Sequence, residues 1–409
     1  MGQDMSGQSN TPASASGSGP LRILHVLRAP LGGLFRHVVD LTRELVARGH
    51  AVGLVCDSTT GGDTADRILL DLAPSLHLGV TRIAMRRNPD LGDIAAFWHV
   101  MQRTRLAQPD IVHGHGSKGG LYARLPGLFA KRVVRAYTPH GGSFNYRPGT
   151  AIHKIYMAAE RLLKNGTGIF LFESEFIEKC FRTYAGDPKT LSRTVWNGIS
   201  DTEFVPVASD GDAVDFLYIG ELRAAKGIDT FIDALAEIDR TTALRPRAIL
   251  AGTGPDRDHL MQQVAQRGLA QRVSFAGALP ARAAFQRARI MVVPSRAESL
   301  PYVVLEAAGA RMPMVSTNVG GIPEIFGPFA DRLIACDHPA TMAASLIAAL
   351  RKQPDQLANE AAHLAQFVAS RFTIAHMVDA VLAGYRDALV AKKGLGHAQS
   401  RPRALVEGH

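Results

Sequence analysis

The sequence is poor in cysteine and in aromatic residues, and it has no long apolar run. Its 409 residues include three cysteines, Cys56, Cys180 and Cys336, which lie far apart and form no CxxC pair. Neither a disulfide framework nor a zinc site is therefore predicted. No stretch approaches the roughly 18 consecutive apolar residues that a membrane-spanning helix needs. The first twenty residues lack the basic start and apolar core of a signal peptide, so we expect a cytoplasmic protein.

The net charge of +9 is concentrated in the first half of the chain. Residues 21–210 carry 24 Lys and Arg against 17 Asp and Glu, whereas residues 211–409 carry 22 against 19. This excess suits an acidic substrate or an anionic membrane surface, although solubility alone is the simpler explanation. No basic run is interleaved with aromatic residues, so nucleic acid is not an expected partner.

Short apolar runs alternate with amphipathic helical patterns, which is typical of parallel α/β folding. In the first half we expect strands at 21–27, 51–56, 109–116, 132–141 and 168–174 and a helix at 35–50. The second half restarts the pattern, with strands at 213–222, 246–254, 272–279 and 288–295 and helices at 228–239 and 256–268. The predicted fold class is α/β, with two Rossmann-like domains that face each other across a cleft.

The expected organisation has five parts. They are a disordered tail at 1–20, a first Rossmann-like domain at 21–208, a second at 209–372, a helix at 373–392 and a basic disordered tail at 393–409. The polar stretch 206–213 is the expected linker between the domains, and the last helix is expected to cross back and brace the first domain.

Ligands of such sheets bind beyond the carboxyl ends of the strands, so the loops at those ends carry the chemistry. The first is RAPLGGLFRH, where Gly32 and Gly33 let backbone approach a ligand while free N–H groups point at an anion. A simple tight turn is the alternative. The motif is not GxGxxG, which argues against a dinucleotide cofactor.

In GELRAAKG, Arg223 and Lys226 follow a strand and precede a helix. Two cations beside a helix N-terminus favour a diphosphate, because the dipole and the side chains attract the same charge. A solvated surface pair is the alternative.

In PSRAESLPYVVLEAAG, two glutamates stand eight positions apart with an apolar run between them. Ser299 is the expected helix cap and Pro301 an early helical residue, which places Glu298 before the helix and Glu306 inside it. An unpartnered carboxylate on an apolar helix costs several kcal/mol, so Glu306 needs a partner. Ribose hydroxyls and an arginine are the two candidates.

Together, ESLPYVVLE, GELRAAKG, AGTGP, NVGGIPEI and GGLFRH resemble the retaining glycosyltransferases of family 4, which have the GT-B fold, and the resemblance runs from about residue 21 to about 390. It implies a nucleoside-diphosphate sugar donor. Glu298 would contact the transferred sugar, Glu306 would hold the ribose, Arg223 and Lys226 would grip the diphosphate, and His140 would line the sugar site. From their places at strand ends and at the helix start we also expect Gly32, Gly33, Gly254, Ser299, Leu300 and Pro301 to bind the donor. In that family, the arginine that grips the diphosphate usually comes directly after the first glycine of the motif that is GELRAAKG here. This chain has Glu221 at that position.

His113 and His115 in HGHGSKGG lack a further ligand at a spacing that suits zinc. We expect them, with His37, to line an acceptor cleft, and Lys118 to lie near a phosphate. The DRD triplet at 256–258 matches the metal-binding DxD of other sugar transferases, but it opens a helix, where acidic residues suit the dipole anyway. We therefore expect no metal ion and no other cofactor.

The sequence thus predicts a cytoplasmic retaining glycosyltransferase that moves a hexose to a glycan or polyprenyl-linked acceptor in bacterial cell-surface polysaccharide or exopolysaccharide biosynthesis. A nucleotide-sugar epimerase or hydrolase of the same fold, and a non-enzymatic sugar-nucleotide-binding protein, are the alternatives.

The segment 85–108 leaves a membrane contact open. On a helix, Phe97, Val100, Met101 and Leu106 would form an apolar stripe, rimmed by Arg86, Arg87, Arg103 and Arg105. An interfacial helix on an anionic membrane has this pattern. Packing of the same stripe on the first sheet is the simpler alternative.

Overall fold

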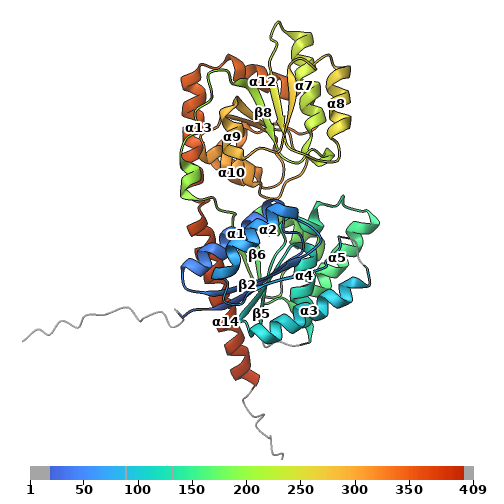
Figure 1. Cartoon of the computed structure of the whole chain (residues 1–409), viewed down its shortest axis with the longest axis vertical. Coiled ribbons are helices and arrows are strands. Elements are labelled where there is room, and N and C mark those ends of the chain that lie inside the picture. The colour runs from blue at the N-terminus through green and yellow to red at the C-terminus, as the bar shows by residue number, and fades with distance from the viewer. Residues whose placement is uncertain (1–18, 88–89, 130–132, 400–409) are drawn as a thin grey trace, which may run out of the picture.

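The computed structural model describes residues 19–87, 90–129 and 133–399. It contains two domains, drawn one above the other in Figure 1, each built on a parallel sheet with helices on both faces. This confirms the predicted α/β class and the two Rossmann-like domains. Residues 1–18 and 400–409 of the two expected tails lie outside the described residues. Within the described residues, no helix is long and apolar enough to cross a membrane.

The first domain holds a seven-stranded parallel sheet in the order β3-β2-β1-β4-β5-β6-β7. Its strands are β1 Arg22–Leu27, β2 Ala51–Asp57, β3 Val80–Ile83, β4 Ile111–His115, β5 Val134–Thr138, β6 Ile169–Phe172 and β7 Leu191–Thr194. Its helices are α1 Gly32–Ala47, α2 Gly62–Leu72, α3 Gly92–Ala107, α4 Gly116–Arg124, α5 Ala151–Leu163 and α6 Glu175–Ala185. The central strands are covered on both faces, which is why they read as continuous apolar runs.

The second domain holds a five-stranded parallel sheet in the order β10-β9-β8-β11-β12. Its strands are β8 Val214–Ile219, β9 Ala248–Ala251, β10 Val273–Gly277, β11 Ala288–Val293 and β12 Met314–Ser316. Its helices are α7 Ile228–Thr241, α8 Arg257–Gln266, α9 Ala281–Gln286, α10 Tyr302–Gly309, α11 Ile322–Phe326, α12 Pro339–Arg351 and α13 Pro354–Ala369.

Strand order reverses once in each sheet, between β1 and β4 and between β8 and β11. Such a switch opens a crevice at the carboxyl ends of the two strands, because their following loops turn to opposite faces. The two crevices face each other, so the fold itself fixes where a ligand binds.

Two chain segments cross between the domains side by side. Ile199 pairs with Thr373 in a parallel bridge, and a Cβ on Gly198 would lie 2.2 Å from the Thr373 carbonyl oxygen. Ile199 is already part of the second domain's core. The chain therefore enters the second domain before the expected linker at 206–213.

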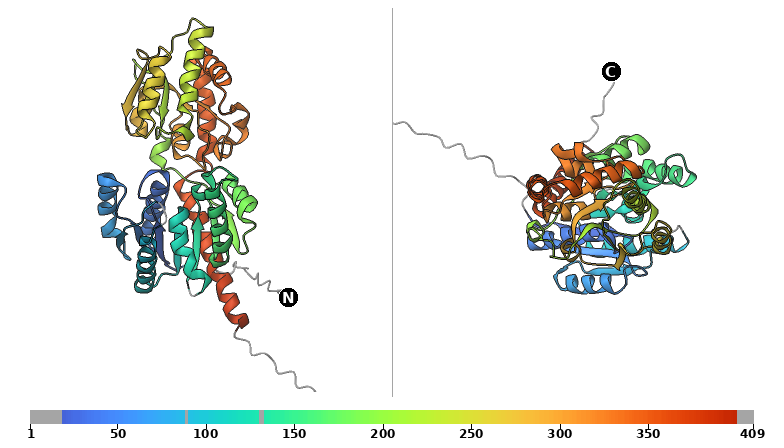
Figure 2. Two further views of the ribbon diagram at one scale, coloured as in Figure 1. Left: turned by 90° about the vertical axis from the view of Figure 1, so that its right-hand side faces the viewer. Right: turned by 90° about the horizontal axis from the view of Figure 1, so that it is seen from above.

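The last helix, α14, runs from Ile374 to Gln399 and packs on α1 and on strands β5, β6 and β7. Figures 1 and 2 show it descending from the second domain along the first. Its residues Met377, Val378, Val381, Leu382, Tyr385 and Ala388 belong to the first domain's core. The expected crossing is thus present, and the helix continues beyond the expected end at 392.

On α3, Val100 is buried and Phe97 packs partly against the core. For these two residues the alternative is therefore correct that the stripe packs inside the first domain. Leu106 is exposed, as are Leu91, Ile94 and Trp98. The predicted stripe is therefore split between a buried face and an exposed one.

Candidate active site

A cleft of about 520 Å³ lies between the carboxyl ends of the two sheets. The first domain contributes the start of α1 and the loop after β5, and the second contributes the loops after β8 and β11 and the first turn of α10. Ten of the sequence-predicted residues line it: Gly32, Gly33, His140, Arg223, Lys226, Glu298, Ser299, Leu300, Pro301 and Glu306. Segments far apart in the sequence therefore meet in one site.

Lys226 and Glu298 are paired on the second domain's side of the cleft. Lys226 Nζ donates to Glu298 Oε1 over 2.6 Å, and Ser295 Oγ donates to the same oxygen over 2.7 Å. The loop that carries Lys226 is held tightly, because a Cβ on Gly227 would lie 2.0 Å from the Pro294 carbonyl oxygen. Both contacts use Oε1, which leaves Oε2 of Glu298 to accept from a ligand hydroxyl.

Arg223 lies nearer the solvent. Its side chain is 45% exposed, against 18% for Lys226, and its Nε is 3.0 Å from Oε2 of Glu221. Glu221 stands at the position where the resemblance implies an arginine. An exposed pair of this kind contributes little energy, so Lys226 is the better-ordered cation of the two.

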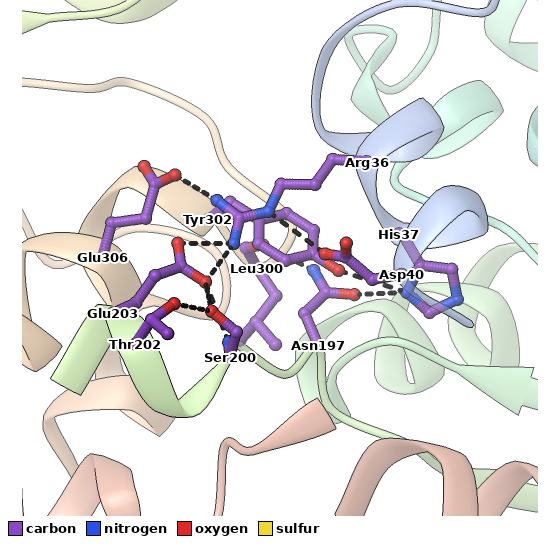
Figure 3. Close-up of polar contacts among 10 residues, drawn as sticks. All are labelled: Arg36, His37, Asp40, Asn197, Ser200, Thr202, Glu203, Leu300, Tyr302 and Glu306. Carbon is purple, nitrogen blue, oxygen red and sulfur yellow. Dashed lines mark hydrogen bonds and ion pairs between the residues drawn. The ribbon is translucent and has the colours of Figure 1, made fainter. Parts of the chain in front are cut away.

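Arg36 of α1 contacts three carboxylates, of which Glu306 and Glu203 tie it to the second domain and Asp40 lies on α1 itself (Figure 3). Its Nη1 contacts Glu306, its Nη2 donates to both oxygens of Glu203 over 2.7 and 2.8 Å, and its Nε lies 3.3 Å from Asp40. The guanidinium carbon is 4.5 Å from the centre of the Tyr302 ring. Of the two partners left open for Glu306, the structure supplies the arginine, and the contact with ribose stays a prediction.

One cation among three carboxylates leaves this part of the cleft negative. Burial raises the pKa of Glu306 and of Asp40, and Arg36 opposes both shifts. Burial alone would lower the pKa of Arg36, but Glu306 and Glu203 raise it on balance. A negative patch suits the hydroxyl groups of a neutral moiety better than it suits a phosphate.

The start of α10 differs from the sequence prediction in detail. Pro301 is the N-cap and no side chain caps the helix, so the predicted cap at Ser299 is wrong. The loop is instead held by Gly321 N–H donating to the Ser299 carbonyl over 2.8 Å and by Asn197 Nδ2 donating to the Leu300 carbonyl over 2.9 Å. The first N–H groups of α10 lack partners within the helix, which keeps the anion-binding interpretation open.

The helix α1 also starts earlier than expected. Gly32 and Gly33 form its first turn rather than a loop before it, and Gly32 has φ +66°. A Cβ on Gly33 would lie 3.4 Å from the Tyr302 ring. Gly33 therefore faces Tyr302 of α10 across the cleft, whereas a Cβ on Gly32 would meet no atom of the described residues within 4 Å.

Five histidines gather at the carboxyl edge of the first sheet: His25, His37, His113, His115 and His140. His140 lines the cleft with φ +53°, an uncommon backbone conformation for a residue with a side chain. Its Nε2 is 3.0 Å from His115 Nδ1, and His115 Nε2 is 3.0 Å from His25 Nδ1. Burial lowers the pKa of all five, so these rings are neutral at physiological pH.

Five predicted site residues are not among those that line the described cleft. His37, His113 and His115 are buried behind it, and Lys118 is buried with its Nζ 2.6 Å from Asp93. Gly254 packs on the loop before Lys226, where a Cβ would lie 2.2 Å from the Leu222 carbonyl oxygen. The predicted acceptor role of the first four stays a prediction.

Three residues of the site were missed in the sequence. Arg36 belongs to the GGLFRH motif, but no sequence pattern links it to Glu306, which is 270 positions away. Asn197 and Glu203 belong to the crossing segment and to the short helix after it. The one signal in the sequence was that Glu306, on an apolar helix, needs a partner such as an arginine.

Two groups of histidines have the geometry to hold a metal ion within the described residues. They are His25 with His113 and His115, and His37 with His115 and His140. His113 and His115 stand two positions apart on β4, but the other members come from β1, from α1 and from the loop after β5, so no sequence spacing marks either set.

The chain matches two protein-family models, one after the other. Residues 31–203 match the model described as Glycosyltransferase Family 4, and residues 200–366 match the model described as Glycosyl transferases group 1. The junction of the two matches coincides with the crossing segment between the domains.

Similar proteins carry related names. The D-inositol 3-phosphate glycosyltransferase of Jonesia denitrificans is 27% identical over 401 residues, which is 88% of this chain and 92% of that protein. The glycogen synthase of Mycobacterium tuberculosis (strain CDC 1551 / Oshkosh) is 26% identical over 325 residues, covering 72% of this chain and 76% of that protein. The Anabaena protein Alr3699/HepE, solved in complex with UDP, shares the fold with a TM-score of 0.71 at 18% identity, covering 89% of this chain and 99% of that one.

Proposed function

This chain belongs to the glycosyltransferase family that the two models describe, with the GT-B fold, and we propose that it moves a hexose from a nucleoside-diphosphate sugar to a glycan or polyprenyl-linked acceptor with retention of configuration. The observation that carries this proposal is the single cleft that gathers His140, Lys226, Glu298 and Glu306 between the two sheets. The solved structure with bound UDP supports a nucleotide donor.

The charges along the cleft suit the two ends of such a donor. Lys226 and the start of α10 provide positive potential for the diphosphate. The carboxylates around Arg36 provide acceptors for the ribose hydroxyls, with Glu306 as the proposed contact. Oε2 of Glu298 and the neutral ring of His140 would bind hydroxyls of the transferred sugar.

In the proposed reaction the bond between the anomeric carbon and the diphosphate oxygen breaks while the acceptor oxygen bonds to the same face of that carbon. The acceptor's proton passes to the departing diphosphate. Lys226 and the N–H groups at the start of α10 stabilise the negative charge that grows on the leaving group. These groups need no metal ion, and we propose that the transfer proceeds without one.

We place the protein in the cytoplasm, in bacterial cell-surface polysaccharide or exopolysaccharide synthesis, with peripheral contact at the inner face of the membrane. The exposed Leu91, Ile94 and Trp98 of α3, together with the exposed Arg86 and Arg87 before it, support this contact. Flotation with anionic and with neutral vesicles tests it. Binding that requires anionic lipid and falls with salt is expected, and equal binding to both vesicles would contradict it.

The function itself is tested by a screen of nucleoside-diphosphate sugars for thermal stabilisation, followed by turnover with and without acceptor. A bound donor stabilises the fold by mass action. Transfer only in the presence of an acceptor, with an unchanged anomeric configuration by NMR, is expected. Donor turnover without acceptor would indicate the epimerase or hydrolase, and binding without turnover would indicate a sugar-nucleotide-binding protein.

A further inference from the structure

Three histidines converge beside the cleft from three separate segments. His37 lies on α1, His115 ends β4 and His140 follows β5. One ring nitrogen of each lies within 4.8 Å of those of the other two. Imidazole nitrogen is a preferred ligand of Zn²⁺ and of other divalent transition metals, so the grouping has the chemistry of a metal site.

The nitrogen atoms are already near the separation that a metal ion requires. His115 Nδ1 and His140 Nε2 are 3.0 Å apart. Two nitrogens bound at about 2.0–2.1 Å to one tetrahedral ion lie roughly 3.3–3.4 Å apart. This pair would have to separate by a few tenths of an ångström, and the ring nitrogen of His37 lies within 4.8 Å of both.

His37 supplies the third nitrogen in the required tautomer. Asn197 Nδ2 donates to the Leu300 carbonyl over 2.9 Å, which turns Asn197 Oδ1 toward His37 Nδ1 at 3.0 Å. An amide oxygen only accepts, so His37 Nδ1 carries the hydrogen and Nε2 carries a lone pair. Within the described residues, this buried Nε2 has no hydrogen-bond partner.

The groups around the three rings resemble those around bound metals. A ligating imidazole usually has its other nitrogen held by a hydrogen bond. Here Asn197 holds His37, and His25 Nδ1 lies 3.0 Å from His115 Nε2. Burial lowers the pKa of His37 to about 4 and keeps His115 and His140 neutral, so protons do not compete with a metal at neutral pH.

The second triad, His25, His113 and His115, is less suited. Both nitrogens of His113 are engaged by groups outside the histidine cluster, Nδ1 with the Tyr385 hydroxyl at 2.7 Å and Nε2 with Thr138 Oγ1 at 2.9 Å, whereas among the described residues His115 Nδ1 contacts only another proposed ligand. All three of its rings are fully buried. In the first triad, by contrast, His140 lines the cleft, which gives an ion a way in and leaves a coordination position for water.

We propose that His37 Nε2, His115 Nδ1 and His140 Nε2 bind one divalent transition-metal ion such as Zn²⁺, with the fourth position open to the cleft. The site does not rest on the proposed transferase reaction, which uses no metal, and its test reads metal binding rather than turnover.

The test uses the full-length chain without a histidine tag. Zn²⁺ binding is measured by equilibrium dialysis against a chelator of known affinity, and Co²⁺ binding by its visible absorption. One ion per chain is expected, with the absorption of a four-coordinate cobalt site. No binding by the wild-type chain, or binding of several ions without that absorption, overturns the proposal.

Two variants locate the ion. His37→Gln removes a proposed ligand and should weaken binding at least about 100-fold, since even loss of an outer partner typically costs 10–100-fold. His113 is a member of the second triad alone, so His113→Gln should bind as the wild type does, as should the exposed control His99→Gln. If His113→Gln loses the ion and His37→Gln keeps it, the ion sits in the second triad and the proposal is wrong.

A further variant covers the case in which His37→Gln does not fold. Asn197→Ala keeps all three rings but releases His37 Nδ1, and it should weaken binding about 10–100-fold. An affinity equal to that of the wild type would show that His37 is not a ligand.

Discussion

The first sheet ends at the cleft in buried neutral histidines, whereas the second ends there in charged pairs. On the first side, His115 and His140 contact each other, and their rings are uncharged. On the second side, Lys226 pairs with Glu298, and Arg296 pairs with Asp229 over 2.7 Å. Strand order reverses in the same way in both sheets, so the fold determines where the site lies. The residues at the strand ends determine its chemistry, and they differ between the two sheets. Lys226 on the charged side suits an anion, and the neutral histidines suit hydroxyl groups.

The largest effect expected from this difference is a selective loss of stability in acid. The pKa of His25 is lowered to about 3 and that of His37 to about 4, mainly by burial. Between these values and 6.5 the folded state binds fewer protons than the unfolded state, so the free energy of unfolding falls as the pH falls below 6.5. At pH 5 the loss is about 2 kcal/mol for each of these two histidines.

Other groups of the first domain modify this loss. His113, His115 and His140 act in the same direction. The buried Glu173, whose pKa burial raises to about 7, acts against it and returns about 2 kcal/mol over the same range. In the second domain His259, His338 and His363 are exposed. Hydrogen exchange at pH 7 and pH 5, corrected for intrinsic rates, should therefore show protection lost in β1, β4 and β5 before β8 and β11. An equal loss in both sheets would remove the distinction between them.

Lys226→Ala tests the charged side. Because negative charge on the diphosphate grows as the glycosidic bond breaks, kcat should fall by about 10²–10³-fold, more than donor affinity does. Lys352→Ala is a matched control, since Lys352 forms a 2.6 Å pair with Glu360 outside the cleft. It should leave kcat unchanged. Steady-state kinetics with varied donor decides, and equal losses in the two variants would indicate a role in stability only.

Glu306→Ala tests the boundary between the two sides. Loss of hydrogen bonds to a charged acceptor should weaken donor binding about 10–100-fold, and Glu306→Gln should be milder. Arg36→Ala is the informative companion, because it removes the ion pair but keeps the carboxylate. If calorimetry finds the two alanine variants equally impaired in donor binding, Glu306 serves Arg36 and not the ribose.

Arg223→Ala should have the smallest effect. Its side chain is exposed and paired with Glu221, and such pairs contribute at most about 1 kcal/mol, so we expect kcat/KM to change less than about fivefold. A loss as large as that of Lys226→Ala would show that Arg223 turns into the cleft when the donor binds.

Much of this architecture was predictable because local pattern and fold agree. The apolar runs before Gly32, Arg223 and Glu298 mark strand ends, and the rule for ligand sites in parallel sheets converts strand ends into a site. Helix starts were less predictable. At Gly32 and at Pro301 the sequence is equally compatible with a loop and with the first turn of a helix. Contacts across the cleft determine which of the two conformations forms.

Contacts between distant segments were not predictable. Arg36 meets Glu306 because the folded chain brings α1 and α10 together, and no spacing in the sequence encodes this contact. His25 and His113 are register partners on adjacent parallel strands, so a search for ligand spacing along the sequence cannot group them. For the same reason, the sequence could not decide whether Glu306 pairs with an arginine or binds ribose hydroxyls.

The crossing helix α14 has a consequence for how the protein is made. Residues up to Ala388 complete the first domain's core, so a ribosome must release nearly the whole chain before that domain closes. Domains of most multidomain proteins fold in order as they emerge, but here the second domain can finish first while the first one waits. A fragment ending at residue 197 should therefore expose the apolar surface that α14 covers and aggregate, whereas supplying residues 374–393 as a separate peptide should restore its solubility.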